Sequence, residues 1–95
     1  MYLEIVSPEA ILFSNEVDSV VVPGVNGEFQ MLNNHAAIVS SLAKGSVKVH
    51  IHSQSVIEDL NEKIVPSETD NKVLTLQINS GTLEMKNNKA IILVD

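Results

Sequence analysis

Three histidines are the residues of this sequence whose side chains are best suited to bind a metal ion or take part in catalysis. His50 and His52 lie two residues apart in an alternating segment, so they would share one face of a β-strand and could bind one ion together. A catalytic metal site usually takes a third protein ligand, and the neighbour at the same spacing is Lys48, which cannot ligate a metal while protonated. A solvated strand face is the favoured interpretation.

Two further features have a chemical and a structural interpretation. His35 lies between Asn34 and Ala36 with no sequence sign of a catalytic triad, which favours a loop histidine with local hydrogen bonds. The segment Gly24–Gly27 has the glycines of a phosphate loop, but it lacks a Gly-Lys-Ser/Thr ending and opens no evident helix, which favours a turn. We therefore expect a non-catalytic protein with no metal ion and no cofactor.

The composition limits the classes of partner. Six lysines, no arginine and twelve acidic residues give a formal net charge of −6, whereas nucleic-acid binding needs clustered cations, so no nucleic acid is expected. A hydrophobic content of 44% fits a globular chain rather than a disordered one. The longest apolar runs, such as Ala90–Val94, are far shorter than the roughly 20 residues of a membrane helix. Without cysteine, disulfides and thiolate metal sites are excluded.

Alternation of apolar and polar residues is the main pattern along the chain. Val47, Val49 and Ile51 would lie on one face of a strand, and residues 73–78 and 82–86 repeat this arrangement. The apolar run at 90–94 predicts a strand buried on both faces. Further short strands are expected at residues 2–6, 11–13, 17–22, 28–32 and 38–43.

Turn residues separate these runs. Pro23–Gly27 favours a tight turn, and Lys44-Gly45 and Asn87-Asn88 favour connections of the hairpin kind. Many short strands at close spacing predict an all-β fold, an antiparallel β-sandwich or flattened barrel of about ten strands. The length predicts a single domain over residues 1–95.

One segment departs from the alternation. Apolar residues recur at helical spacing from Val56 to Ile64, and Ser55 followed three residues later by Glu58 fits a capping box. This pattern predicts a short helix near residues 55–64. An irregular excursion between two strands is the alternative.

Residues 20–49 carry a specific combination of motifs. Its elements are Gly27-Glu28-Phe29, Leu32, His35-Ala36, Leu42, Gly45 and Val47. At this spacing they resemble the N-terminal β-sandwich domain of the epsilon subunit of bacterial F-type ATP synthase. Leu3–Ser7 and residues 80–95 resemble the opening strands and the closing hairpin of that family, whereas about 53–71 looks like an insertion.

The resemblance implies a non-catalytic subunit of the central stalk of the proton-translocating enzyme. Such a subunit links gamma to the ring of c subunits and couples rotation to ATP synthesis on other subunits. It would be peripheral, on the cytoplasmic side of the bacterial inner (plasma) membrane, and would meet the membrane only through the complex. By position, the c-ring contact falls on Gly24, Val25, Asn26, Gly27 and Glu28, and gamma contacts fall on Ser7, Leu12, His35 and Ser40.

The sequence also departs from the family pattern. Asn33 and Ala37 stand where the family usually has prolines, which frees φ at two positions of a rigid turn. Bacterial relatives often continue past the position of Asp95 into a helical hairpin that is absent here. We therefore expect this chain to couple rotation without a helical brake and without a nucleotide site.

Two other function classes remain open from the residues alone. A stand-alone β-sandwich ligand-binding module would commonly display aromatic platforms, and this chain has only Tyr2, Phe13 and Phe29. A small cupin-like metal enzyme would need His35, His50 and His52 to converge. A stalk subunit instead needs an apolar docking face, for which Val6 and Val20–Val22 are the outward-facing candidates.

Overall fold

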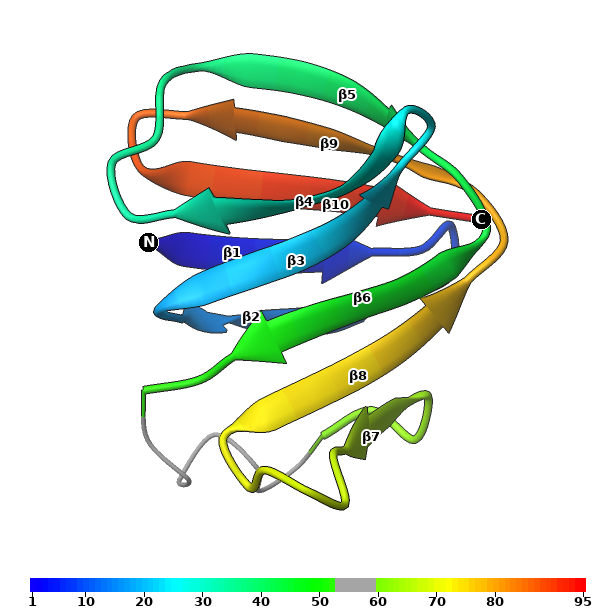
Figure 1. The fold of residues 1–95 in the computed structure, drawn as a ribbon. Coiled ribbons are helices and arrows are strands. Elements are labelled where there is room, and N and C mark those ends of the chain that lie inside the picture. The colour runs from blue at the N-terminus through cyan, green and yellow to red at the C-terminus, as the bar shows by residue number, and fades with distance from the viewer. Residues whose placement is uncertain (53–59) are drawn as a thin grey trace.

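The computed structural model describes residues 1–52 and 60–95, and it is built from β-strands (Figure 1). The all-β prediction is confirmed, because ten strands lie within these residues. Their bounds are β1 Tyr2–Val6, β2 Ile11–Glu16, β3 Ser19–Gly24, β4 Gly27–Leu32, β5 Ile38–Leu42, β6 Gly45–His50, β7 Ile64–Pro66, β8 Val73–Ile78, β9 Gly81–Lys86 and β10 Lys89–Val94. No helix in the described ranges is long and apolar enough to cross a membrane.

The strands fold into two packed layers. The back layer of Figure 1 has the order β2-β1-β10-β9-β5, and the front layer has the order β4-β3-β6-β8-β7. The layers join where Gly24 of β3 pairs with Leu42 of β5, so the sandwich is closed along one side. The parallel pair β1–β10 is the exception to antiparallel pairing among the described strands.

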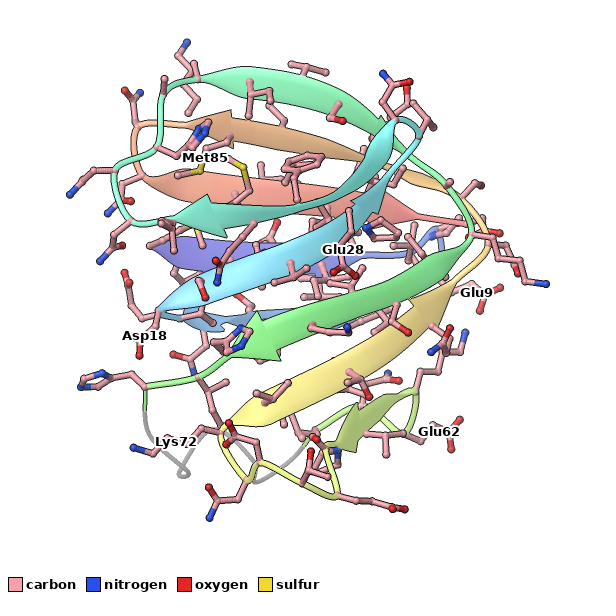
Figure 2. The ribbon with its side chains drawn as sticks, viewed as in Figure 1. Glu9, Asp18, Glu28, Glu62, Lys72 and Met85 are labelled. Carbon is pink, nitrogen blue, oxygen red and sulfur yellow. The ribbon has the colours of Figure 1, made fainter. Side chains whose placement is uncertain are left out.

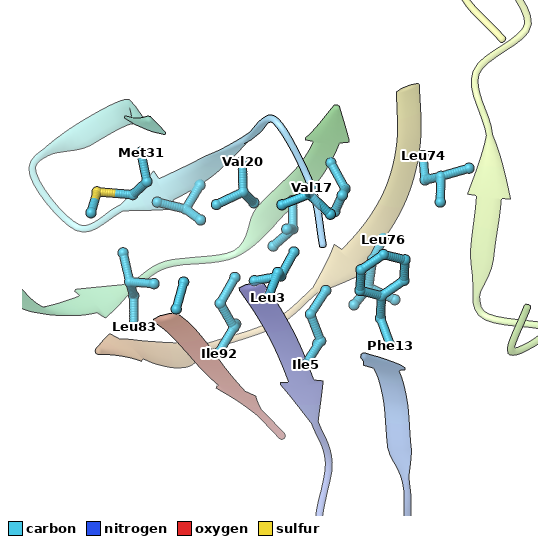
Figure 3. Close-up of a cluster of buried hydrophobic side chains, with 14 of the residues drawn as sticks. Leu3, Ile5, Phe13, Val17, Val20, Met31, Leu74, Leu76, Leu83 and Ile92 are labelled. Atoms are coloured by element: carbon cyan, nitrogen blue, oxygen red, sulfur yellow. The ribbon is translucent and has the colours of Figure 1, made fainter. Parts of the chain in front are cut away.

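The core lies between the two layers and is made of side chains that alternate along each strand. Leu3, Ile5 and Ile92 of the back layer pack toward Val20 and Met31 of the front layer, and all five are fully buried (Figure 3). The alternation predicted for residues 47–51, 73–78 and 82–86 is confirmed by the buried valines, leucines, isoleucines and methionine of those strands. Burial of each such side chain contributes about 1.5–3 kcal/mol to folding.

Two of the three predicted turns close hairpins. Asn87 and Asn88 have φ of 53° and 59° between β9 and β10, as a two-residue hairpin of the favoured type requires. Val25 and Asn26 connect β3 to β4, and Gly27 follows at φ 122°. The hairpin prediction for Lys44-Gly45 is wrong, because β5 and β6 do not pair with each other and both border β3.

The helix predicted near residues 55–64 is not found in the part that can be checked. Residues 55–59 lie outside the described residues, whereas 60–63 form coil and a turn, and Ile64 begins β7. Ile64 is buried opposite Leu76 of β8, so its apolar side chain packs the edge strand β7 against the core. In the described part, Leu60 packs against the core and Ile64 is buried without a helix between them. The insertion at 53–71 stays a prediction.

Candidate interaction surfaces

The turn between β3 and β4 forms an exposed tip with a carboxylate beside it. Val25 and Asn26 are exposed, and the Val25 amide donates a hydrogen bond to the Ser41 carbonyl at 3.1 Å, which ties the turn to β5. Glu28 lies on the outer side of the front layer, with its Oε2 3.7 Å from Nζ of Lys48 (Figure 2). The five residues assigned to the c-ring contact are therefore contiguous, accessible and held to a second strand.

The four residues assigned to gamma do not form one exposed patch. Ser7 and Leu12 are 8% and 6% exposed, and Ser7 Oγ accepts a hydrogen bond from the Ala10 amide at 3.2 Å, which stabilises the turn after β1. Ser40 is half-buried opposite Leu83 of β9. His35 is exposed in the loop between β4 and β5, where its Nδ1 lies 2.7 Å from the Ala36 carbonyl. Ser7 and Leu12 thus have roles within the fold.

An apolar surface covers part of the outer side of the back layer. We call the outward-facing side chains of β2, β1, β10, β9 and β5 the back face. Ile11, Val6 and Leu93 lie side by side across three strands of this face, with Ile11 62% and Leu93 52% exposed. Ile91 is half-buried beside Leu93, whereas Val39 on β5 is 76% exposed and lies beyond Glu84 of β9. The contiguous row of β2, β1 and β10 is the kind of patch that marks an interface.

Two predictions about apolar residues need correction, one for residues 90–94 in the back layer and one for Val20–Val22 in the front layer, where only Val21 faces outward. The strand at 90–94 is not buried on both faces, because Leu93 is half exposed. Val20 and Val22 do not face out, because they pair with Met31 and Phe29 on the core side of the front layer and are fully buried. Val6 is half-buried on the back face, next to Leu93. The outward apolar row therefore belongs to β2, β1 and β10.

The histidines have different surroundings in the described structure. His50 is on the outer side of the front layer between Ser19 and Val73, and its Nδ1 is buried without a hydrogen-bond partner. His52 Nδ1 lies 3.4 Å from Asp18 Oδ1, and both side chains are well exposed. Within residues 1–52 and 60–95 no group of three metal-binding side chains comes together. The arrangement that a cupin-like enzyme needs is not present in those ranges.

Hollows on the described surface are small and shallow. Three of them, of about 240, 290 and 300 Å³, lie along the back face between β5, β9, β10 and the end of β1. Pockets for small molecules usually enclose about 300–1,000 Å³, so these hollows suit side chains of a docked protein better than a whole ligand.

A fourth hollow, of about 210 Å³, opens between β2 and β8 and is lined in part by Leu12, Leu76 and Asp95. The pKa of the Asp95 carboxyl is affected most by desolvation, which raises it, and next by hydrogen bonds from the backbone of Ser80 and neighbouring residues, which lower it. The net result is a pKa below the usual range of an aspartate. This site remains anionic and exposed, and it does not resemble a catalytic carboxyl.

Comparison with known proteins identifies the family. Residues 1–59 match the family described as "ATP synthase, Delta/Epsilon chain, beta-sandwich domain". The chain belongs to the ATP synthase delta/epsilon family. The resemblance seen in the sequence motifs is confirmed, and relatives in this family align with almost the whole chain.

Relatives within the delta/epsilon family differ in length. The ATP synthase epsilon chain of Chlorobaculum tepidum is 37% identical over 93 residues, which are 98% of this chain and 86% of that relative. The epsilon chain of Desulforamulus reducens is 31% identical over 93 residues, and there the match spans 57% of the relative. The chain thus covers most of one epsilon chain and little more than half of another.

Solved structures share the delta/epsilon fold. The central stalk and c-ring structure of Tetrahymena thermophila mitochondrial ATP synthase contains a chain with a TM-score of 0.69 at 12% identity, covering 98% of this chain and 61% of that one. The Euglena gracilis mitochondrial ATP synthase structure contains a chain with a TM-score of 0.74 at 17% identity, covering 97% of this chain and 48% of that one. At these identities the likeness shows the fold alone.

Proposed function

We propose that this delta/epsilon chain is a non-catalytic subunit of the central stalk of a proton-translocating ATP synthase. It binds the gamma subunit through the back face and the ring of c subunits through the β3–β4 turn. Rotation of the ring is thereby coupled to ATP synthesis on other subunits. The subunit is peripheral, on the cytoplasmic side of the bacterial inner membrane, and reaches the membrane only through the complex.

The back face is the observation that carries this proposal. Leu93 and Ile11 are more than half exposed although they extend one apolar row across three strands. Covering this row by a partner would stabilise the complex by roughly 25 cal/mol per Å² of apolar surface. A strand with apolar residues on both sides is normally covered on both sides. In this proposal, gamma covers the outward side of β10.

The residues first assigned to gamma support the same surface. Ser7 follows Val6, Leu12 follows Ile11, and Ser40 follows Val39, so three of the four are sequence neighbours of back-face residues. Neighbouring residues of a strand point to opposite faces. We therefore assign the contact with gamma to the outward-facing neighbours Val6, Ile11 and Val39, and His35 contributes from the loop that leads into β5.

The β3–β4 turn suits contact with the polar loops of a rotating ring. Its tip is held by backbone pairing of β3 with β4 and by the hydrogen bond from Val25 to Ser41. A close-packed sandwich behind the turn resists deformation, as transmission of torque requires. Glu28 supplies a carboxylate beside the tip, in contact with Lys48.

Co-purification tests the proposal with a matched pair of variants. Leu93→Asp places a charge on the back face, and Val65→Asp places one on the front layer at a residue of similar exposure, 56% against 52%. We expect the tagged wild-type chain and Val65→Asp to elute with gamma and the c-ring from solubilised membranes. Leu93→Asp should lose most of the gamma, because an unpaired buried charge costs several kcal/mol. Equal recovery of gamma with both variants would refute the assignment of the back face.

A further inference from the structure

Two lysines face each other across the hairpin that closes the back face. Lys86 of β9 pairs directly with Lys89 of β10, and both side chains are exposed on the same side of the sheet. Like charges directly opposite each other destabilise a strand pair. Among the described residues the ion pairs use neither of these lysines. Within residues 1–52 and 60–95, no carboxylate therefore lies within ion-pair distance of either lysine, although Glu84 is on the same face.

The hairpin holds the two lysines in place. Asn87 and Asn88 form the tight turn between them, with φ of 53° and 59°. The Asn88 carbonyl accepts a hydrogen bond from the Tyr2 amide at 3.1 Å, and its Oδ1 accepts one from the Asn34 amide at 2.7 Å. Lys89 Nζ lies 5.7 Å from the centre of the Tyr2 ring. Because these contacts already hold the hairpin in place, less conformational entropy is lost when a partner binds.

A hollow lies beside the pair and connects it with the apolar surface. Its volume is about 300 Å³, and Glu84, Lys86, Asn87, Lys89 and Ile91 line it. Leu93 lies four residues beyond Lys89 on the same strand face, which is a separation of about 13 Å. One docked protein surface can therefore cover the apolar row and reach the lysines, whereas a free anion would contact only the lysines.

We propose that Lys86 and Lys89 together bind a carboxylate side chain of the gamma subunit when gamma covers the back face. The lysine pair then orients gamma, because an acidic residue must lie about 13 Å from the side chain that packs on Leu93. This inference rests on the proposed function of the back face. The contact surface of gamma then has an acidic group at one end, against the lysines, and apolar groups at the other end, against Leu93.

Charge reversal with a matched control tests the lysine pair. Lys86→Glu/Lys89→Glu and Lys63→Glu/Lys72→Glu have the same net charge, and Lys63 and Lys72 are exposed in turns beside β7 and β8. The measurement is the affinity of each full-length double variant for purified gamma at low and at high salt. We expect the first to bind at least about tenfold more weakly at low salt, with a smaller loss of affinity as salt rises, and the control to stay within about twofold.

The outcomes separate this inference from the proposed function. Equal weakening by both double variants would show a general charge effect and overturn the lysine site. Unchanged binding by Lys86→Glu/Lys89→Glu, with binding lost in Leu93→Asp, would also overturn it and leave the back face as the gamma contact. Unchanged binding by Leu93→Asp as well would refute the proposed function itself. Circular dichroism of each variant confirms that the fold is retained.

Discussion

The outer sides of the two layers differ in how their side chains are satisfied. On the front layer, Gln30 donates to Ser19 Oγ at 3.1 Å and Thr75 donates to the Val65 carbonyl at 2.9 Å. Gln77 donates to Ser46, and Lys48 lies beside Glu28. These polar contacts separate the outward apolar residues of that layer, such as Val21 and Leu32, from one another.

The back face has the opposite arrangement. Ile11, Val6 and Leu93 are contiguous across three strands, and Ile91 adjoins them. No ion pair among the described residues includes the back-face side chains of Glu4, Glu84, Lys86 and Lys89. The front layer thus has polar contacts between its outward apolar residues, although His50 Nδ1 there has no hydrogen-bond partner. The back face has a continuous apolar row, and its side-chain contacts, such as the hydrogen bond between Tyr2 and Ser14, do not interrupt that row. Contiguity, more than the number of apolar residues, distinguishes the back face from the front layer.

The largest expected effect separates the two sides of β10. Ile92→Ala removes a fully buried side chain and should lower the free energy of unfolding by about 2–5 kcal/mol, whereas Leu93→Ala should change it by less than about 0.5 kcal/mol. Urea denaturation of the isolated chain measures both. A large loss of stability in Leu93→Ala would mean that Leu93 serves the fold, which would weaken the argument that it awaits a partner.

A smaller effect tests the polar contacts of the front layer. Ser19 is 5% exposed and accepts the hydrogen bond from Gln30, so Ser19→Ala should cost about 1 kcal/mol of stability. Thr82→Ala on the back face, where the side chain is exposed, should be close to neutral. The same denaturation experiment compares the two. Equal costs would remove this distinction between the two outer sides.

The smallest effect on folding concerns the turn. Glu28→Lys breaks an exposed ion pair with Lys48, and such pairs contribute only about 0–1 kcal/mol. The isolated variant should therefore unfold at nearly the same urea concentration as the wild type. Its attachment to the c-ring and proton-driven ATP synthesis should fall, with hydrolysis by the detached catalytic head unchanged. Glu62→Lys, an exposed carboxylate beside β7, is the control. Unimpaired coupling in Glu28→Lys would contradict the assignment of the turn.

Strand positions and the family were predictable from the sequence, whereas of the proposed docking face only Val6 was named in advance. Alternation placed Val47, Val49 and Ile51 in the core because an amphipathic strand has only one way to bury its apolar side. The apolar run at 90–94 indicated that both faces of this strand are buried. A local sequence pattern cannot tell whether the outward face is covered by the same chain or by a partner. The outward positions of β10 are occupied by Ile91 and Leu93. These two apolar residues were the signal in the sequence that could have located the back face.

The helical spacing near Leu60 and Ile64 misled for a related reason. Spacing alone does not fix the backbone conformation: Leu60 packs against the core from coil and Ile64 is buried at the start of β7, four residues later. Ser7 and Leu12, which the family resemblance assigned to gamma, are buried, and their contact with gamma stays a prediction. Adjacent residues of a strand point to opposite faces, so a position carried over from a relative does not fix which of two neighbouring side chains is accessible.

Cysteine labelling tests most directly whether the back face is the surface that gamma covers. The chain has no cysteine, so Leu93→Cys, Val39→Cys and Val65→Cys each provide a single exposed thiol. The rate of maleimide labelling is measured for each variant alone and in complex with gamma. We expect gamma to slow labelling at positions 93 and 39 by at least about tenfold and to leave position 65 unchanged, since a buried interface excludes solvent. Slowing at position 65 with full reactivity at 93 and 39 would contradict the account.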